Sequence, residues 1–237
     1  MPWAASASCE SRVLDLWEQA VGLDRWRRED VLLAAADASS RRLGARNAAL
    51  LAVRAALFDR AWPLKSRCPA CASQCEFEVD SLALAGELSR QETTEFATFD
   101  WAGFSVRARA PTVDDLAAVS RQPDAANAGR ALLGRCLTGA LDLANADEAE
   151  IEELSRHLER LDPGAAVGFA LRCPACKHEW SAIIDVGAAL WTEVQHAAEQ
   201  SLIEVDALAR AYGWTEEEIM RLSPTRRAAY LQLVGDS

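Results

Sequence analysis

The apolar residues of the first part of the chain recur at the three- and four-residue spacing of an amphipathic helix. Residues 13–21 follow this spacing, and so do the shorter segment 30–36 and the longer segment 43–58. Pro63 ends the run, because proline lacks the amide hydrogen that a helix interior requires. The pattern therefore predicts an N-terminal helical segment over residues 1–62.

A different pattern, the alternation of polar and apolar residues, surrounds a tetrapeptide that occurs twice. Cys-Pro-Ala-Cys stands at Cys68–Cys71 and again at Cys173–Cys176. Alternating segments follow the first copy at 76–80 and flank the second copy at 167–171 and 180–185. Because a two-residue period is typical of strands, each copy is predicted to be the turn of a β-hairpin.

The segment between the two copies has elements of its own. Residues 96–110 alternate again, with Gly103 at the expected turn, and predict a third hairpin. Thr112 is a suitable N-cap for the helix that follows this hairpin. Two more helices are expected, over 127–141 and 147–161.

The last part of the chain is predicted to be helical again. Its apolar residues form one stripe along 187–212, and Gly213 is a natural stop for that helix. The sequence Thr215–Glu218 is a capping box that begins a short helix. Ser223-Pro224 begins another, with serine as the cap and proline at the first helical position.

These elements predict an α+β fold that is predominantly helical. Its centre is a split zinc ribbon, whose two CPxC hairpins lie at 63–85 and 164–186. Between them, 86–163 forms an inserted hairpin with helices. The segments 1–62 and 187–237 supply the N-terminal and C-terminal helical regions.

Composition narrows the class of protein. Half of the 237 residues are hydrophobic and 26% are charged, which allows a buried core and argues against disorder. No apolar run approaches the roughly 20 residues of a membrane span. The N-terminus lacks the basic and apolar regions of a signal peptide. We therefore expect a cytoplasmic protein, or a part of a particle assembled in the cytoplasm, without a membrane span.

The charge argues against a nucleic-acid partner. The formal net charge is −11, whereas non-specific binding to nucleic acid depends on lysine and arginine near the phosphates. The short basic groups Arg41-Arg42 and Arg226-Arg227 are interpreted as solvated helix faces.

The two cysteine pairs are the strongest chemical signal in the sequence. Cys68, Cys71, Cys173 and Cys176 provide the four thiolates of a tetrahedral structural zinc site. Such a closed shell leaves no position for a substrate. Three alternatives stay open: an iron site with the same ligands, a dithiol redox site, and cysteines without a shared ligand.

The remaining cysteines and one histidine have less certain roles. Cys75 is interpreted as a packing residue that could substitute as a ligand. Cys9 and Cys136 are expected to be ordinary apolar or surface residues. His178 follows Cys176 closely and is expected near the metal without binding it.

The sequence shows no catalytic motif. His157 and His196 lie in helical segments with charged neighbours and are expected to be exposed. Asp114-Asp115 and residues 216–218 are acidic groups in the first turn of a helix, where they favour the helix dipole. No phosphate-binding loop or nucleophile motif is present. The chain is therefore predicted not to be an enzyme.

The order of several short motifs resembles a known family. The motifs are Arg109-Ala-Pro111-Thr112-x-x-Asp115-Leu116, Leu171-x-Cys173-Pro-x-Cys176-x-His178-x-Trp180, Asp185, Leu190-Trp191-x-Glu193 and Tyr212-Gly-Trp214-Thr-x-x-Glu218-Ile219-x-x-Leu222-Ser-Pro224-x-Arg226-Arg227-x-x-Tyr230. In this order they resemble small zinc-ribbon proteins of phage-tail-like contractile injection systems, which are described as baseplate or tail-assembly proteins.

The resemblance implies a role in building the baseplate, with metal ligands at Cys68, Cys71, Cys173 and Cys176. Lys177 departs from the pattern, because such ribbons often carry glycine there. A lysine at that position is strained if its φ is positive. Cys75 also departs from it, since an apolar residue is expected at that point.

The expected function is that of a non-enzymatic structural or assembly protein of a contractile particle. It would be held together by zinc and would bind baseplate or tail proteins, either permanently or as a chaperone. A nucleic-acid-binding zinc-ribbon regulator and a CPxC thiol oxidoreductase are the alternatives. Trp26, Trp214 and Tyr230 are candidate partner contacts, although the two tryptophans are expected to lie in the core. The oligomeric state is not predicted.

Overall fold

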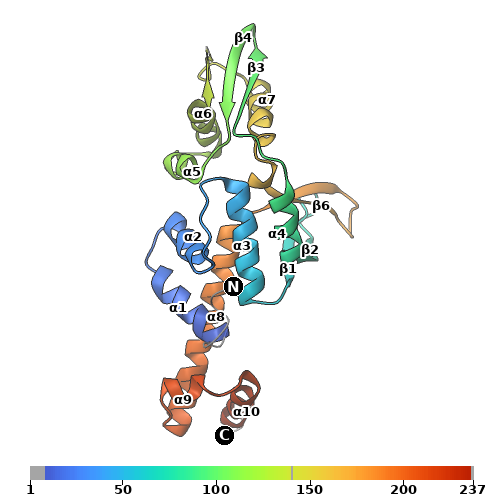
Figure 1. The fold of residues 1–237 in the computed structure, drawn as a ribbon. Helices are drawn as coiled ribbons and strands as arrows, with labels where there is room; N and C mark the ends of the chain where they lie inside the picture. Colours follow the sequence, from blue (N-terminus) through green and yellow to red (C-terminus); the bar gives the residue numbers. More distant parts are fainter. Residues whose placement is uncertain (1–8, 140, 236–237) are drawn as a thin grey trace. The chain divides into compact units, whose positions relative to one another are not determined.

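The computed structural model describes residues 9–139 and 141–235, with helices and small antiparallel sheets (Figure 1). It divides into two compact units. The terminal unit contains residues 1–31 and 188–237, and the central unit contains residues 32–187. The N-terminal residues 1–8 and the side chain of Cys9, on which part of the expectations rest, lie outside the described part.

The terminal unit is helical, as the pattern predicts. Its elements are α1 (Cys9–Ala20), most of α2 (Arg25–Ala34), α8 (Val186–Tyr212) from residue 188 onward, α9 (Glu216–Met220) and α10 (Pro224–Gly235). The predicted stripe along α8 is confirmed in part: Leu190, Val194 and Leu208 are fully buried, whereas Leu202 and Tyr212, which were predicted to belong to it, are exposed. The second helix begins five residues earlier than expected. The Asp24 carboxylate accepts the backbone N–H groups of Trp26 and Arg27 and so caps this earlier start.

The two predicted helix boundaries near the end of the chain are confirmed. Gly213 has φ +69° and its N–H donates to the carbonyl of Ala209, which ends α8. Thr215 and Glu218 form both hydrogen bonds of the capping box that begins α9.

Arg227 does not lie on a solvated helix face, so that interpretation is wrong for this residue. Only 3% of its side chain is exposed, and the guanidinium bridges two carboxylates on other helices. Nε donates to Glu204 of α8 at 2.6 Å and Nη2 donates to Glu10 of α1 at 2.6 Å. A buried guanidinium is stable only with such partners, and these come from distant parts of the sequence.

The central unit contains α3 (Leu43–Leu57) packed on α4 (Ser81–Arg90) and two hairpins. The first hairpin pairs β1 (Ala61–Arg67) with β2 (Gln74–Asp80), and the second pairs β6 (Val167–Arg172) with β7 (Glu179–Ile184). Both hairpins were predicted. We refer to them as the first and second cysteine hairpins.

Between the cysteine hairpins lies an insert with a core of its own. Its strands are β3 (Phe96–Trp101), β4 (Phe104–Arg109) and β5 (Leu137–Thr138), in that order across the sheet. Its helices are α5 (Val113–Val119), α6 (Ala125–Cys136) and α7 (Glu148–Glu159), and the short 3-10 helix η1 (Pro163–Ala165) follows them. Val106, Ala108, Leu133, Leu154 and Leu158 form the centre of the core.

The predicted hairpin 96–110 is confirmed, but the helix predicted over 127–141 ends at Cys136. Leu137 and Thr138 pair instead with Ala108 and Arg107 of β4. Leu137 is buried in the core of the insert. The sheet edge therefore provides both hydrogen bonds and apolar burial, and these override the local helical pattern.

Asp115 holds the parts of the insert together. Its side chain is 2% exposed and accepts two hydrogen bonds from Arg109, at 2.6 and 2.8 Å, and one from Nε of Arg135 at 2.9 Å. Thr112 donates its backbone N–H and its hydroxyl to the same carboxylate. These bonds, led by those from Arg109, hold the pKa of Asp115 well below its usual range despite its burial.

Asp162 performs a similar task at the end of the insert. It is 1% exposed, and its Oδ2 accepts the backbone N–H of Gly44 at 2.9 Å. Gly44 lies in the first turn of α3, whose N-cap residue Arg42 makes no side-chain capping bond. Asp162 therefore supplies an acceptor, and a negative charge, to a helix N-terminus 118 residues away in sequence.

The beginning and the end of the insert lie side by side. The N–H of Thr94 donates to the carbonyl of Leu161 at 2.9 Å. The amide of Asn47 on α3 donates to the carbonyls of Gly164 and Ala165. The chain therefore leaves α4 and returns to β6 at neighbouring points, and the insert does not separate the two cysteine hairpins.

Gly44→Ala is expected to destabilise the central unit. A Cβ at this position would lie 2.2 Å from Oδ1 of Asp162 and 3.1 Å from the backbone of Gly164, so the capping contact must open. We expect a loss of about 1–3 kcal/mol in the free energy of unfolding, measured by urea titration. Gly129→Ala on α6 is the control, since nothing lies within 4 Å of its Cβ. It should raise stability by up to about 1 kcal/mol. Equal stability of Gly44→Ala and wild type would contradict the argument.

Asp115→Asn is expected to cost about 3 kcal/mol at neutral pH, because it leaves two arginines without their carboxylate. The folded-state pKa of Asp115 is depressed. Its stabilisation is thus fully present above the unfolded-state value of about 3.9 and lost as the pH falls below it. The difference between wild type and variant should therefore shrink as unfolding is measured from pH 6 towards pH 3. Asp114→Asn, which removes an exposed carboxylate next to it, should cost less than about 1 kcal/mol. A pH-independent difference would refute the assignment.

Candidate metal centre

The two cysteine hairpins repeat the same structure. In the first, Ser66 faces Cys75 across the strands, and in the second Leu171 faces Trp180. Both members of the second pair lie 105 positions after those of the first, as the cysteines do. Each Cys-Pro-Ala-Cys sequence occupies the turn between two strands, as predicted.

The backbone of the two turns is also the same. The N–H of Cys68 donates to the carbonyl of Ser73, and the N–H of Cys173 donates to that of His178. A second hydrogen bond joins the residue after each pair to the first cysteine of that pair. The N–H of Ala72 donates to the carbonyl of Cys68, and the N–H of Lys177 donates to the carbonyl of Cys173. These bonds curl each turn so that both of its sulfurs face the same side.

The expected strain at Lys177 is present. Its φ is +64°, and Ala72 at the matching position of the first turn has φ +59°. Residues with a Cβ rarely adopt this left-handed region, which costs on the order of 1 kcal/mol per residue. Lys177 Nζ also donates to the carbonyl of Pro174 at 2.8 Å, a bond that glycine could not make. The turn geometry is thus imposed by the hydrogen bonds around it and not by the local residue preference.

The sulfurs of Cys68, Cys71, Cys173 and Cys176 all lie within 4.8 Å of one another. Two of these separations join the hairpins: Cys68 to Cys176 and Cys71 to Cys173, each 3.6 Å. A tetrahedral site with metal–sulfur bonds of about 2.3 Å needs sulfurs about 3.8 Å apart. The described cysteines form no disulfide. The four residues therefore fit a metal ion that joins both hairpins.

Burial differs in the same way within each pair. The first cysteines, Cys68 and Cys173, are almost fully buried, whereas Cys71 and Cys176 are exposed. Trp180 packs against the buried pair. Beside the cluster, the rings of Phe77 and Phe169 join the two hairpins with centroids 5.4 Å apart. Apolar packing therefore brings the hairpins together on one side and leaves the other side accessible.

The thiols have unequal acidities. Backbone N–H groups of Cys176 and Ala175 lower the pKa of Cys173 to about 6. The N–H of His178 lowers the pKa of Cys176, but hydrogen bonds with Cys71 and Cys68 raise it, to about 12. The pKa values of these two thiols are thus shifted in opposite directions. Because a metal ion binds cysteine as the thiolate, metal affinity at this site must fall as the pH falls.

The neighbouring candidates lie close to the cluster without joining the group of four ligands. Cys75 is 7% exposed and packs against Cys68 and Cys173, which agrees with the packing role predicted for it. Its sulfur faces the carbonyl of Ser73 at 3.8 Å. The ring of His178 is exposed and lies parallel to that of Trp180, with centroids 6.3 Å apart. Cys136 is buried in the core of the insert, far along the chain from either pair.

A dithiol redox site needs a different setting. In such sites the reactive cysteine lies at a helix N-terminus, where the helix dipole stabilises its thiolate. Here both pairs lie in turns between two strands, and sulfurs of different pairs lie only 3.6 Å apart. The geometry therefore favours shared coordination of one ion over exchange within a pair.

The other histidines and the aromatic candidates are only partly as predicted. His196 is exposed, but the ring of His157 stacks on Phe99 with centroids 3.7 Å apart, so the expectation for it was wrong. Burial lowers the pKa of His157. Trp26 and Trp214 are half-buried and not in the core as expected. The ring of Trp214 contacts Tyr212 and Tyr230, with centroids 4.6 and 4.9 Å away.

The chain matches no family model, no curated protein and no solved structure. Among the described residues, no helix is both long enough and apolar enough to cross a bilayer. The class of the site is thus defined by its own geometry: a four-cysteine cluster that could hold a metal ion between two hairpins.

Cys173→Ser should abolish stoichiometric metal binding and lower the melting temperature strongly, because three thiolates no longer close the tetrahedral shell. Elemental analysis of the purified protein, with a thermal melt, measures both effects and identifies the ion. Cys75→Ala is the control: it removes a buried thiol that lies outside the group of four ligands. It should keep one ion per chain and lose only about 1 kcal/mol. Cys173→Ser with wild-type metal content and melting temperature would exclude the site.

Proposed function

We propose that the four-cysteine cluster holds a structural zinc ion. Four thiolates in a tetrahedral arrangement are typical of structural zinc sites, which have no open position for a substrate. The group contains no histidine or carboxylate that would indicate a catalytic site. Iron with the same four ligands is the competing choice, and the elemental analysis described above distinguishes the two.

We infer that the chain is a non-enzymatic structural or assembly protein. The observation that carries this proposal is the position of the cluster: its ligands come from two hairpins on either side of the insert. A metal ion there fixes the insert relative to α3 and α4 without taking part in chemistry. The ion would therefore stabilise one conformation of the central unit, and other proteins would bind to that conformation.

The particular assembly that we propose is the baseplate of a contractile, phage-tail-like particle. The support for this proposal is the resemblance in sequence. In addition, the residues of the resembling motifs make hydrogen bonds and ring contacts within the fold. Arg109 and Thr112 form hydrogen bonds with the buried carboxylate of Asp115 in the insert. The segment from Tyr212 to Tyr230 contains the aromatic cluster and the capping box of α9.

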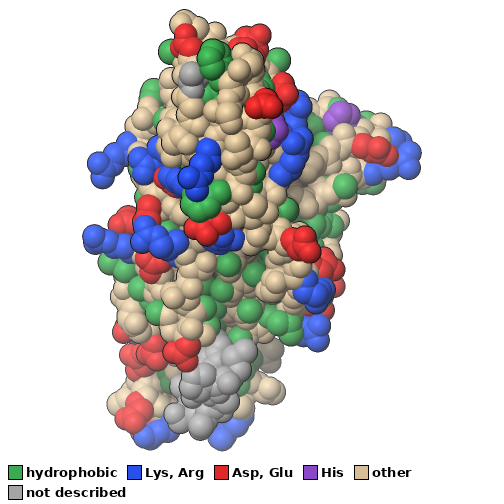
Figure 2. Space-filling model, turned by 45° about the horizontal axis from the view of Figure 1, so that its top comes forward, with side chains coloured by type: hydrophobic (Ala, Val, Ile, Leu, Met, Phe, Trp, Pro, Cys, Tyr) green, Lys and Arg blue, Asp and Glu red, His purple; other side chains and the backbone are tan. Residues whose placement is uncertain are grey.

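Surface charge supports protein partners over nucleic acid. On the face shown in Figure 2, acidic and basic side chains are interspersed. Several arginines are already paired with carboxylates, such as Arg60 with Asp80 and Arg172 with Glu179. With a net charge of −11, the chain offers little excess basic surface to a phosphate backbone.

The proposal predicts that the tagged protein, purified from cells that carry its gene, is recovered with sheath, tube or baseplate proteins. Large particles are separated from soluble protein by sedimentation, and both fractions are identified by mass spectrometry. Presence in the particles indicates a permanent subunit, and presence with one or two tail proteins only in the soluble fraction indicates a chaperone.

Two controls make this experiment specific. An untagged strain reports adventitious recovery, and Cys173→Ser, expected to lose the metal-held arrangement, should lose the partners as well. Recovery without any tail protein in either fraction would remove the baseplate proposal. It would leave the metal site and the structural role unaffected.

A further inference from the structure

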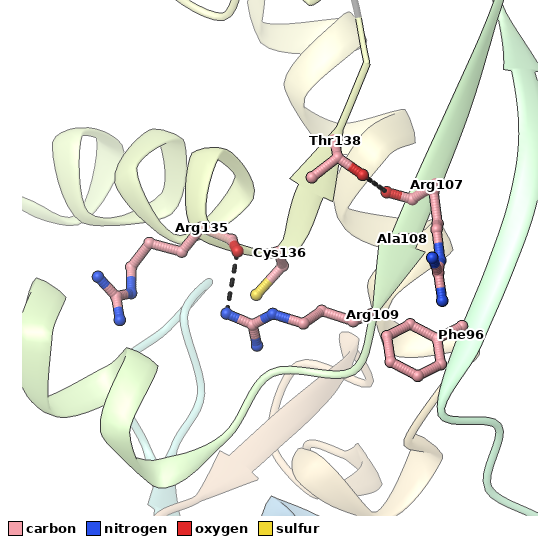
Figure 3. A pocket seen from close by; sticks show the side chains of 7 residues that line it. All are labelled: Phe96, Arg107, Ala108, Arg109, Arg135, Cys136 and Thr138. Carbon is pink, nitrogen blue, oxygen red and sulfur yellow. Dashed lines mark hydrogen bonds between the residues drawn. The ribbon is translucent and has the colours of Figure 1, made fainter.

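The insert carries a pocket of about 270 Å³ that the metal site does not use (Figure 3). Its walls come from β3, β4, β5 and the end of α6, and include Phe96, Arg107, Arg109, Arg135 and Cys136. Three arginine residues thus contribute to the walls of one hollow in a chain whose net charge is −11. Figure 3 shows that Arg135 turns its carbonyl oxygen towards Arg109, while its guanidinium extends away from the other lining residues. A basic hollow in a strongly acidic protein indicates that this part of the surface is suited to bind a negatively charged group.

The alternation of β4 places two of these arginines on the same face. Val106 and Ala108 are fully buried in the core of the insert. Arg107 and Arg109 therefore point to the opposite face of the sheet, as Figure 3 shows. Phe96 faces Arg109 across the β3–β4 pair, and Thr138 faces Arg107 on the other side. One face of the sheet consequently combines cations, a ring and a hydroxyl group.

Asp115 fixes part of this surface but does not neutralise it. Its carboxylate binds both Nη atoms of Arg109 and the Nε of Arg135. The guanidinium of Arg109 also donates to the carbonyl of Arg135, so hydrogen bonds to two different residues fix its position. A single negative charge is shared by two arginines, and the third arginine lies outside this network.

That third arginine, Arg107, is held in place without being paired. Its guanidinium lies over the ring of Phe96, 4.3 Å from the centroid. Within the described residues its side chain makes no hydrogen bond and no ion pair. Stacking restricts the side chain, so that less rotational freedom is lost when it binds a ligand. Its planar fork of N–H groups matches the oxygens of a carboxylate or a phosphate.

We propose that this pocket binds an oxyanion, either a carboxylate or a phosphate group, with Arg107 as the principal contact and the positive charge of Arg109 beside it. The volume is slightly below the roughly 300 Å³ at which pockets for whole small ligands begin. The ligand is therefore a small anion or a group of amino-acid size, whose apolar part lies against Phe96. This proposal does not rest on the proposed function or on the metal.

The test is an NMR titration of the full-length, metal-loaded, ¹⁵N-labelled protein. Glutarate is the carboxylate probe and inorganic phosphate is the phosphate probe, each added at constant ionic strength maintained with sodium chloride. We expect saturable shifts of the backbone signals of Ala108, Cys136 and Thr138. The probe that binds more tightly identifies the kind of oxyanion, and either order supports the proposal.

Variants of Arg107 connect the binding to this residue. Arg107→Gln should weaken binding at least tenfold, and Arg107→Lys should have an intermediate effect because it keeps the charge and loses the fork. The exposed Arg121 lies outside the pocket, and Arg121→Gln should bind as wild type does. Shifts that grow linearly with added salt and never saturate would overturn the proposal. Unchanged affinity in both Arg107 variants would overturn it as well.

Discussion

The central unit depends on one constraint: four sulfurs from hairpins about a hundred residues apart must meet at one point. A cross-link that closes a loop of this length is worth roughly 5 kcal/mol in the chain-entropy model, and the same entropy opposes its formation. The structure lowers that cost before any metal is bound. Thr94 and Leu161 join the two ends of the insert, and Asp162 fixes its end to the first turn of α3. The fold therefore brings the second cysteine hairpin to the first, and a metal ion would bind at a site whose four sulfurs already lie within 4.8 Å of one another.

Two buried carboxylates contribute to this positioning in different ways. Asp162 binds a helix N-terminus, where backbone N–H groups and the helix dipole favour a negative charge. Asp115 binds two arginines and a threonine within the insert. Each carboxylate is almost inaccessible to water, so the loss of a hydrogen-bond partner is costly. Asp115 has several such partners, whereas Asp162 accepts the N–H of Gly44 through Oδ2 and its Oδ1 is buried without a partner among the described residues. As a consequence, the parts of the insert are held together and its C-terminal end is fixed to α3. A metal site shared by the two cysteine hairpins requires this arrangement.

Sequence patterns predicted the features that depend on neighbouring residues. The hairpin turns at the cysteine pairs, the N-cap position of Thr112, the capping box at Thr215 and the end of α8 at Gly213 all follow local rules, and the structure has them. The four candidate ligands were also predicted, because their spacing is itself the signal. The errors concern distant partners. Nothing near Arg227 indicates that Glu10 and Glu204 surround it, and nothing near Leu137 indicates that β4 offers it a sheet edge.

Because the hairpin occurs twice, metal binding at the shared site depends on the folding of the whole central unit. Each hairpin provides two candidate ligands and the same two turn hydrogen bonds. Each also has a residue with positive φ directly after its second cysteine, Ala72 in the first and Lys177 in the second. Neither half alone can complete a four-coordinate shell. A bound ion is therefore stable only when both halves are placed together, and their placement depends on a folded insert with Asp162 at its end. Metal affinity and the stability of the insert are consequently linked, since each state that opens the insert also separates the ligands.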